Sequence, residues 1–227
     1  MSGLIHEVVP VGWLQCNCSV LGDRVTKEAL VVDPGDEVER ILAIISEHGL
    51  KVKAIVNTHA HIDHVGGLAK MRAATGAPVL MHGEDLELYR ILDQQAAMIG
   101  MPMPPLAQVD SLLKDGEIVR WGGYEARVMH TPGHTRGSCC LHVPKKLDES
   151  SEVVTPDSKG DRLIAGDTLF AGSIGRTDLW GGSFEDIIAS IRSKLLALPD
   201  GTLVFPGHGP QTTIGEERES NPFLQRL

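Results

Sequence analysis

Residues 52–64 read VKAIVNTHAHIDH, an apolar run followed at once by three histidines and an aspartate. The apolar run predicts a buried strand over Val52–Asn57. On extended backbone His59 and His61 project to the same side, and Asp63 and His64 follow where the chain turns into a helix. Imidazole and carboxylate groups are common ligands of divalent metals. The stretch therefore predicts a metal site in which one short piece of chain faces two neighbouring metal positions.

Three more candidate ligands share one setting, a glycine-flanked turn directly after a predicted strand. They are His134 after the strand 124–130, Asp167 after the strand 163–165 and His208 after the strand 203–205. Glycine beside each candidate allows close backbone approach and unusual φ values. Functional side chains gather on loops that a rigid scaffold holds in place. With the first stretch, these residues make five histidines and two carboxylates on strand-end loops.

The remaining apolar patterns alternate between strand and helix periods along the whole chain. Strands are predicted at 4–9, 13–21, 29–33, 52–57, 79–82, 108–111, 117–121, 124–130, 138–143, 162–165 and 203–205, and helices at 37–48, 65–75, 85–98 and 184–196. A polar stretch at 144–161 is predicted to be an exposed loop or hairpin extension. Strands come first, helices alternate after them, and the order repeats in the second half. This pattern predicts an α/β fold, an αββα sandwich that forms a single domain over residues 1–227.

Composition narrows the classes of partner. The 227 residues carry a formal net charge of −9, which disfavours nucleic acid as a partner, because binding it needs a basic face. No apolar run approaches the roughly 18 residues of a membrane span, and the first ten residues lack a signal-peptide pattern, so we expect a cytoplasmic protein. The cysteines form two close pairs in apolar surroundings, where we expect buried thiols and no disulfide. The sequence leaves the oligomeric state open.

Four motifs together resemble the metallo-β-lactamase superfamily in order and spacing, over about residues 4–215. They are THAHIDH at 58–64, TPGHT at 131–135, GDT at 166–168 and PGHG at 206–209. The resemblance implies the αββα sandwich and a centre of two divalent metals, with zinc expected first and iron or manganese as alternatives. It implies that one metal is held by His59, His61, His134 and Asp167, and the other by Asp63, His64, Asp167 and His208, with Asp167 bridging.

Within the superfamily, GDTLFAG at 166–172 and GRTD at 175–178 look most like short bacterial members of the glyoxalase II branch, the hydroxyacylglutathione hydrolases. That likeness implies cleavage of a small-molecule thioester such as S-lactoylglutathione by metal-bound hydroxide, with Asp63 orienting the water. Arg176 stands where those enzymes place a basic substrate contact, although an ion pair with Asp178 or Glu185 would explain it equally. The chain ends 19 residues after His208 (227 − 208), so we expect no C-terminal glutathione-binding helical domain.

Other activities of the same fold stay open at this point. Persulfide dioxygenases hold a single iron at positions matching His59, His134 and Asp167 and share the GRTD stretch, but their usual cysteine two residues before the arginine is Ile174 here. A lactonase or another ester hydrolase is a further alternative. A β-lactamase is disfavoured, because Asp167 stands where the common type has a cysteine ligand. A non-catalytic binding protein is disfavoured by the complete ligand set.

Two further groups of residues are candidates for supporting roles. Met98, Met101 and Met103 lie in a proline-rich segment and form either a flexible apolar wall over the metal site or fillers of the core. His82 and His130 end predicted strands, where either could hydrogen-bond to a metal ligand.

Overall fold

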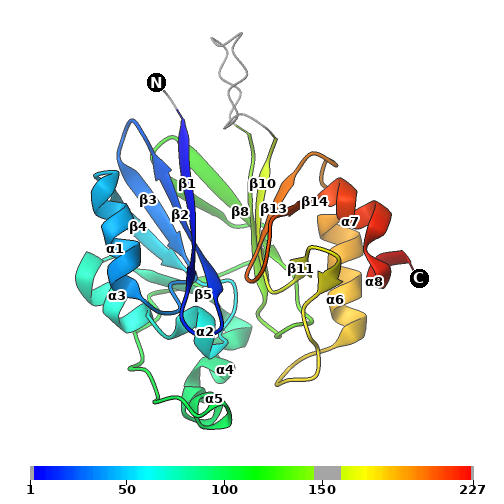
Figure 1. Cartoon of the computed structure of the whole chain (residues 1–227), viewed down its shortest axis with the longest axis horizontal. Coiled ribbons are helices and arrows are strands. Elements are labelled where there is room, and N and C mark those ends of the chain that lie inside the picture. Colours follow the sequence, from blue (N-terminus) through cyan, green and yellow to red (C-terminus); the bar gives the residue numbers. More distant parts are fainter. Residues whose placement is uncertain (1–2, 146–159, 226–227) are drawn as a thin grey trace.

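Two six-stranded sheets pack against each other in the computed structural model, which describes residues 3–145 and 160–225 (Figure 1). The first sheet has the order β1 (Leu4–Val11), β2 (Cys16–Asp23), β3 (Glu28–Val32), β4 (Lys51–Val56), β5 (Val79–His82) and β6 (Ser111–Leu113). The second has the order β14 (Thr212–Thr213), β13 (Leu203–Pro206), β10 (Arg162–Gly166), β9 (Cys139–Val143), β8 (Tyr124–His130) and β7 (Ile118–Trp121). A short pair, β11 (Leu169–Phe170) and β12 (Ser173–Ile174), stands beside them.

Helices cover the outer face of each sheet, as Figure 1 shows. Beside the first sheet lie α1 (Val38–Glu47) and α3 (Leu68–Thr75). At its lower end in Figure 1 lie α2 (Ile62–Val65), α4 (Leu86–Arg90) and α5 (Leu92–Ile99), with a 3₁₀ turn, η1 (Gly83–Asp85), before α4. Beside the second lie α6 (Phe184–Ser190), its π-helical continuation η3 (Ile191–Leu195), α7 (Ile214–Ser220) and α8 (Pro222–Gln225). The predicted α/β sandwich of αββα type is confirmed.

The alternation of side chains along a strand explains how the first sheet contributes to two hydrophobic cores. On β3, Leu30 and Val32 pack into the core between the sheets, whereas Ala29 and Val31 pack under the helices. Successive side chains of a strand point to opposite faces, so one buried apolar run supplies both cores. Both faces of β3 are therefore closed to water, and the site lies at the end of the sheets.

Several element boundaries differ from the sequence predictions. The strand predicted at 13–21 begins at residue 16, because residues 12–15 form the turn between β1 and β2, where Gly12 and Gln15 take positive φ. The helix predicted at 85–98 is broken at Ile91, whose φ of −99° and ψ of 27° leave the helical region. The helix predicted at 65–75 begins only at Leu68, and the strand predicted at 108–111 lies at 111–113. The short elements β11, β12, β14, α7 and α8 were not predicted.

Other expectations have mixed outcomes. All four cysteines are buried and free, as predicted. The polar extension predicted over 144–161 falls mostly on residues 146–159, outside the part that the structure describes. Among the described helices, none is both long and apolar enough to cross a membrane.

Candidate metal centre

Three histidine side chains meet at the end of β4 and β8. His59 and His61 follow β4, and His134 follows β8 from the opposite sheet. His61 Nδ1 lies 2.9 Å from His134 Nε2, and His134 Nε2 lies 3.3 Å from His59 Nε2. All three residues are buried. The two sheets thus contribute jointly to one cluster of ring nitrogens.

A second cluster joins Asp63 and His64 of α2 to His208, which follows β13. His208 Nε2 lies 3.0 Å from Asp63 Oδ2 and 3.3 Å from His64 Nε2. Asp167, after β10, stands between the two clusters. Its Oδ2 lies 3.5 Å from His134 Nε2, and its Oδ1 lies 3.4 Å from His64 Nε2. The structure therefore brings all seven predicted side chains to one place, with Asp167 in the middle.

Hydrogen bonds on the far side of the rings show which nitrogen is free to bind a cation. His134 Nδ1 faces the backbone carbonyl of Arg176 at 2.8 Å, and His208 Nδ1 faces that of Leu14 at 3.0 Å. A carbonyl oxygen only accepts, so each Nδ1 must carry the proton. In the neutral ring this leaves Nε2 as a bare lone pair pointing into the cluster.

The same logic applies to His64 and His59 through Asp33. His64 Nδ1 faces Asp33 Oδ2 at 3.0 Å, and Thr58 donates its hydroxyl proton to the same carboxylate oxygen at 2.6 Å. The Thr58 oxygen then accepts from His59 Nδ1 at 3.1 Å. Asp33 therefore fixes the tautomer of one histidine directly and of the other through a hydroxyl group. This arrangement is typical of ligands held by a surrounding hydrogen-bond network.

These donor atoms fit divalent metals. Metal–ligand bonds of about 2.0–2.2 Å put neighbouring ligand atoms roughly 3–3.5 Å apart, close to the 2.9–3.7 Å found within the clusters. Among the described residues, Asp167 Oδ1 is buried and accepts no hydrogen bond. A buried carboxylate oxygen without a donor is costly unless a cation compensates its charge. The His/Asp cluster is a divalent metal site.

The surroundings oppose the cationic form of His59 and His61 but favour a positive charge at His64. Burial, followed by repulsion from His134, lowers the pKa of His61 to about 3, and burial holds the pKa of His59 well below its usual range. Burial also acts to lower the pKa of His64, but Cys16 and the surrounding carboxylates raise it well above its usual range. A bound metal would displace a proton from His64, so metal affinity should fall as the pH falls.

Two buried side chains that sequence reasoning missed hold the ligand loops. Asp85 accepts from the backbone N–H of Ala60 at 2.8 Å, the hydroxyl of Thr135 at 2.9 Å and the backbone N–H of Gly137 at 2.6 Å. Gln95 accepts from the N–H of Ile62 at 2.9 Å and donates to the carbonyl of Ala60 at 3.1 Å. Asp85 thereby ties the His59–His61 loop to the loop that carries His134. Asp33, the last residue of the strand predicted at 29–33, was not among the predicted site residues, so its hydrogen bonds to Thr58 and His64 were missed as well.

Arg176, His82 and His130, which the sequence suggested for supporting roles, have other side-chain partners than the histidines and aspartates of the cluster. The Arg176 guanidinium forms a two-pronged ion pair with Asp178, at 2.7 and 2.9 Å, on the surface. The His82 and His130 rings stack on each other with centroids 4.0 Å apart, and His130 bonds the carbonyl of Arg136 rather than a metal ligand.

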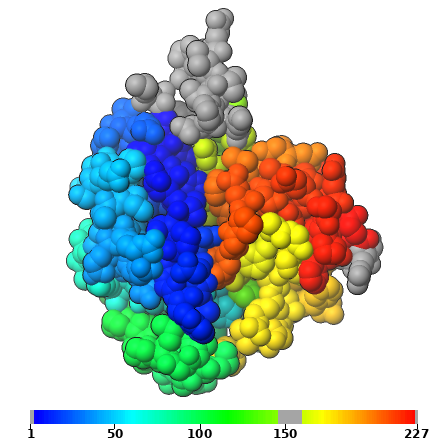
Figure 2. Space-filling view, in the orientation of Figure 1, coloured from blue at the N-terminus to red at the C-terminus, as the bar shows by residue number. Residues whose placement is uncertain are grey.

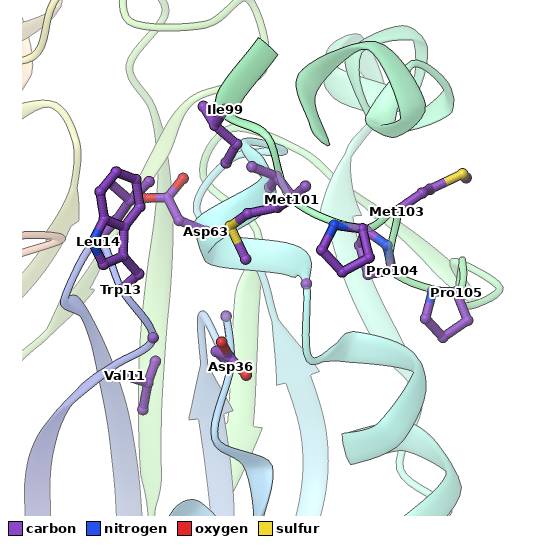
Figure 3. Close-up of a pocket in the computed structure, with 15 residues that line it drawn as sticks. Val11, Trp13, Leu14, Asp36, Asp63, Ile99, Met101, Met103, Pro104 and Pro105 are labelled. Carbon is purple, nitrogen blue, oxygen red and sulfur yellow. The ribbon is translucent and has the colours of Figure 1, made fainter. Parts of the chain in front are cut away.

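The three methionines of the predicted apolar wall differ in position. Met101 and Met103 line a pocket beside Asp63 (Figure 3), while Met98 is exposed and is not among the residues that line it.

Known proteins resemble this chain over nearly its full length. A family model described as the metallo-beta-lactamase superfamily matches residues 11–146 and 150–208. An uncharacterized protein of Aquifex aeolicus is 41% identical over 99% of both chains. The hydroxyacylglutathione hydrolase GloC of Haemophilus influenzae is 38% identical over 96% of this chain and 97% of its own. The probable metallo-hydrolase YqgX of Bacillus subtilis is 36% identical over 95% of each.

Solved structures give the same fold. The BLEG-1 B3 metallo-beta-lactamase superposes with a TM-score of 0.84 at 36% identity, covering 97% of this chain and 99% of that one. TTHA1623 in a di-iron-bound form gives 0.76 at 38% identity, covering 96% and 100%. ETHE1 from Myxococcus xanthus gives 0.78 at 25% identity, covering 98% and 86%.

Proposed function

The chain belongs to the metallo-β-lactamase superfamily, and we propose that it is a metal-dependent hydrolase that cleaves small-molecule thioesters of the S-lactoylglutathione type. The observation that carries this proposal is the position of Asp167 between two clusters of histidine and aspartate donor atoms, which suits two cations sharing one carboxylate. The 38% identity to GloC over nearly the whole of both chains supports the choice of thioester. Zinc is the first metal to test, and the di-iron-bound relative makes iron the next, followed by manganese.

The seven side chains would form two adjacent metal sites. One cation would be held by His59, His61, His134 and Asp167, and the other by Asp63, His64, His208 and Asp167. A bound pair of divalent metals polarises a carbonyl and lowers the pKa of water toward about 7.

We assign the orientation of the water to Asp63, and its exposure supports this role. Its side chain is 18% exposed, whereas that of His64 beside it is fully buried. It also lines the pocket next to the centre, so it is the point where substrate and donor atoms meet.

The chain's thiols give no support to covalent catalysis. Burial raises the pKa of Cys16 to about 12 and that of Cys140 to about 11. At neutral pH these groups are protonated, and the thiol is a poor nucleophile compared with the thiolate. Hydrolysis by water is therefore the mechanism that these side chains favour.

A second candidate is a persulfide dioxygenase, favoured by the likeness to ETHE1 over 98% of this chain. His59, His134 and Asp167 would hold a single iron in that case. Ile174, in place of the cysteine usual in that family, and the Thr168-Leu169-Phe170 sequence after Asp167 count against it. A lactonase is the third activity to compare.

The test uses one protein preparation and two assays. Loss of S-lactoylglutathione is followed in one, and oxygen uptake with glutathione persulfide in the other, with a simple lactone as a further substrate. The proposal predicts thioester cleavage without oxygen uptake, and loss of that cleavage in Asp167→Ala. Oxygen uptake without thioester cleavage would overturn it in favour of the dioxygenase.

A further inference from the structure

A cavity of about 340 Å³ opens beside Asp63, at the edge of the metal centre (Figure 3). One wall comes from the turn between β1 and β2 and includes Trp13 and Leu14. The other comes from the end of α5 and the proline-rich segment after it, and includes Met101 and Met103. Figure 2 shows these segments, blue and green, meeting at the lower surface although they lie far apart in the sequence. The volume is within the range of small-molecule sites, roughly 300–1,000 Å³.

The walls of this cavity are unusually apolar for exposed surface. Twelve large hydrophobic side chains of the described residues are exposed, and four of them line this one cavity. Trp13 is 74% exposed, although a tryptophan has much to gain from being covered. In Figure 3 the Met101 side chain points toward Asp63, whereas that of Met103 extends away from it. Methionine and tryptophan at such density are typical of a binding surface that adapts to an apolar ligand.

Within the described part of the chain, the walls of the cavity offer no cationic side chain to an anionic substrate group, so a glutathione group would lie outside the cavity. Among the described residues that line it, Asp36 and Asp63 are charged, and none is a lysine, arginine or histidine. Asp63 belongs to the metal centre, so Asp36 is the charged side chain that the walls themselves contribute. The two carboxylates of a glutathione group would find no ion-pair partner in these walls. An uncharged aliphatic chain would bury the exposed apolar walls instead.

We propose that this cavity binds an aliphatic chain of the substrate, so that the enzyme prefers thioesters with an extended apolar chain to those with a short polar acyl group. This inference rests on the proposed thioester hydrolysis, because Asp63 places the cavity next to the reacting bond. Burial of apolar surface sets the expected size of the preference. Each methylene that enters the cavity should raise kcat/KM roughly threefold to fourfold until the cavity is filled.

The first experiment measures kcat/KM with the metal-loaded enzyme. One series of thioesters varies the acyl chain from acetyl to octanoyl on the neutral thiol N-acetylcysteamine, and a second keeps acetyl and lengthens the alkyl thiol. The series that shows the rise identifies the side of the bond that the cavity holds. Met101→Ser should flatten the rise, and Leu106→Ser, at an exposed neighbouring residue outside the cavity, should leave it unchanged.

The second experiment measures binding without turnover. Trp13 fluorescence is titrated with methyl, butyl and hexyl thioethers of N-acetylcysteamine, which cannot be hydrolysed, and Trp13→Phe identifies the signal. The proposal predicts tighter binding with chain length, lost in Met101→Ser. Such binding without any thioester cleavage would overturn the proposed function and leave the apolar site standing. Thioester cleavage at a rate independent of chain length, with no chain-dependent binding, would overturn the apolar site alone.

Discussion

Substitution of Asp85 by alanine should loosen the metal centre without touching a metal ligand. The carboxylate accepts from two buried backbone N–H groups, those of Ala60 and Gly137, and from the Thr135 hydroxyl. The hydroxyl keeps another partner in Ser138, 2.7 Å away, but the two N–H groups lose theirs. Each buried donor left unpaired costs about 1–3 kcal/mol.

The sum is about 2–6 kcal/mol, and the electrostatics of Asp85 favour the lower half. Burial raises the pKa of this carboxyl group, although its three hydrogen bonds act to lower it. Removing the carboxylate thus also removes a desolvation penalty. We therefore expect the free energy of unfolding to fall by about 2–4 kcal/mol. Metal affinity should fall about 10- to 100-fold, because the loops carrying His59, His61 and His134 lose their common tether.

Urea unfolding followed by circular dichroism measures the first quantity, and competition with a chelator of known affinity measures the second. Asp85→Asn keeps the size of the side chain and one acceptor oxygen, so it should lie between Asp85→Ala and the wild type. Asp93→Ala, an exposed acid on the neighbouring helix α5, is the matched control. An Asp85→Ala protein with wild-type stability and wild-type metal affinity would refute the tethering role.

Three further predictions concern other parts of the molecule. Burial, then the charge of Arg162, lowers the pKa of His6 to about 3, so the free energy of unfolding should fall by about 1.4 kcal/mol per pH unit as the pH drops from about 6.5 toward 3. His6→Phe should remove this component of the pH dependence, which urea unfolding between pH 7 and 5 measures. The same pH dependence in His6→Phe and the wild type would contradict the assignment to His6. A Cβ at Gly207 would collide with Asp167 Oδ1 and lie 2.8 Å from His64 Cε1, so Gly207→Ala should lose bound metal in elemental analysis, while Gly201→Ala, with open space around it, should retain it. Arg176→Ala breaks only a surface ion pair, so the midpoint of thermal unfolding should hardly change. If the guanidinium contacts the anionic thiol part of the substrate, KM for S-lactoylglutathione should rise while kcat changes less. An unchanged KM would leave the ion pair with Asp178 as the only role of Arg176.

The seven side chains that meet at the candidate metal centre could be found from sequence because each stands in a local signal. His59, His61, Asp63 and His64 fall within six residues, and the other candidates each follow a strand and a glycine. Strand-end loops of a sandwich meet at one edge, so the topology brings these segments together. The apolar periodicity was likewise sufficient for the α/β class, since it follows directly from which faces must be buried.

The supporting residues left no such signal. Gln95 lies within a helix, where a polar residue usually faces solvent, and only the fold shows it buried between Ala60 and Ile62. Asp85 meets its partners 25, 50 and 52 residues away in the sequence. The short strands β11 and β14 contain two residues each, too few for a period to be visible. These features depend on tertiary contacts, which a local pattern does not contain.

The most direct test of the metal centre is the metal content of the purified protein, measured by mass spectrometry together with thioester cleavage in the same buffer. We expect about two divalent metals per chain, loss of cleavage when a chelator removes them, and its return when they are restored. Asp167→Ala should hold less metal and cleave no thioester. Thioester cleavage that persists in metal-free protein, or full metal content and activity in Asp167→Ala, would contradict hydrolysis at a two-metal centre that shares Asp167.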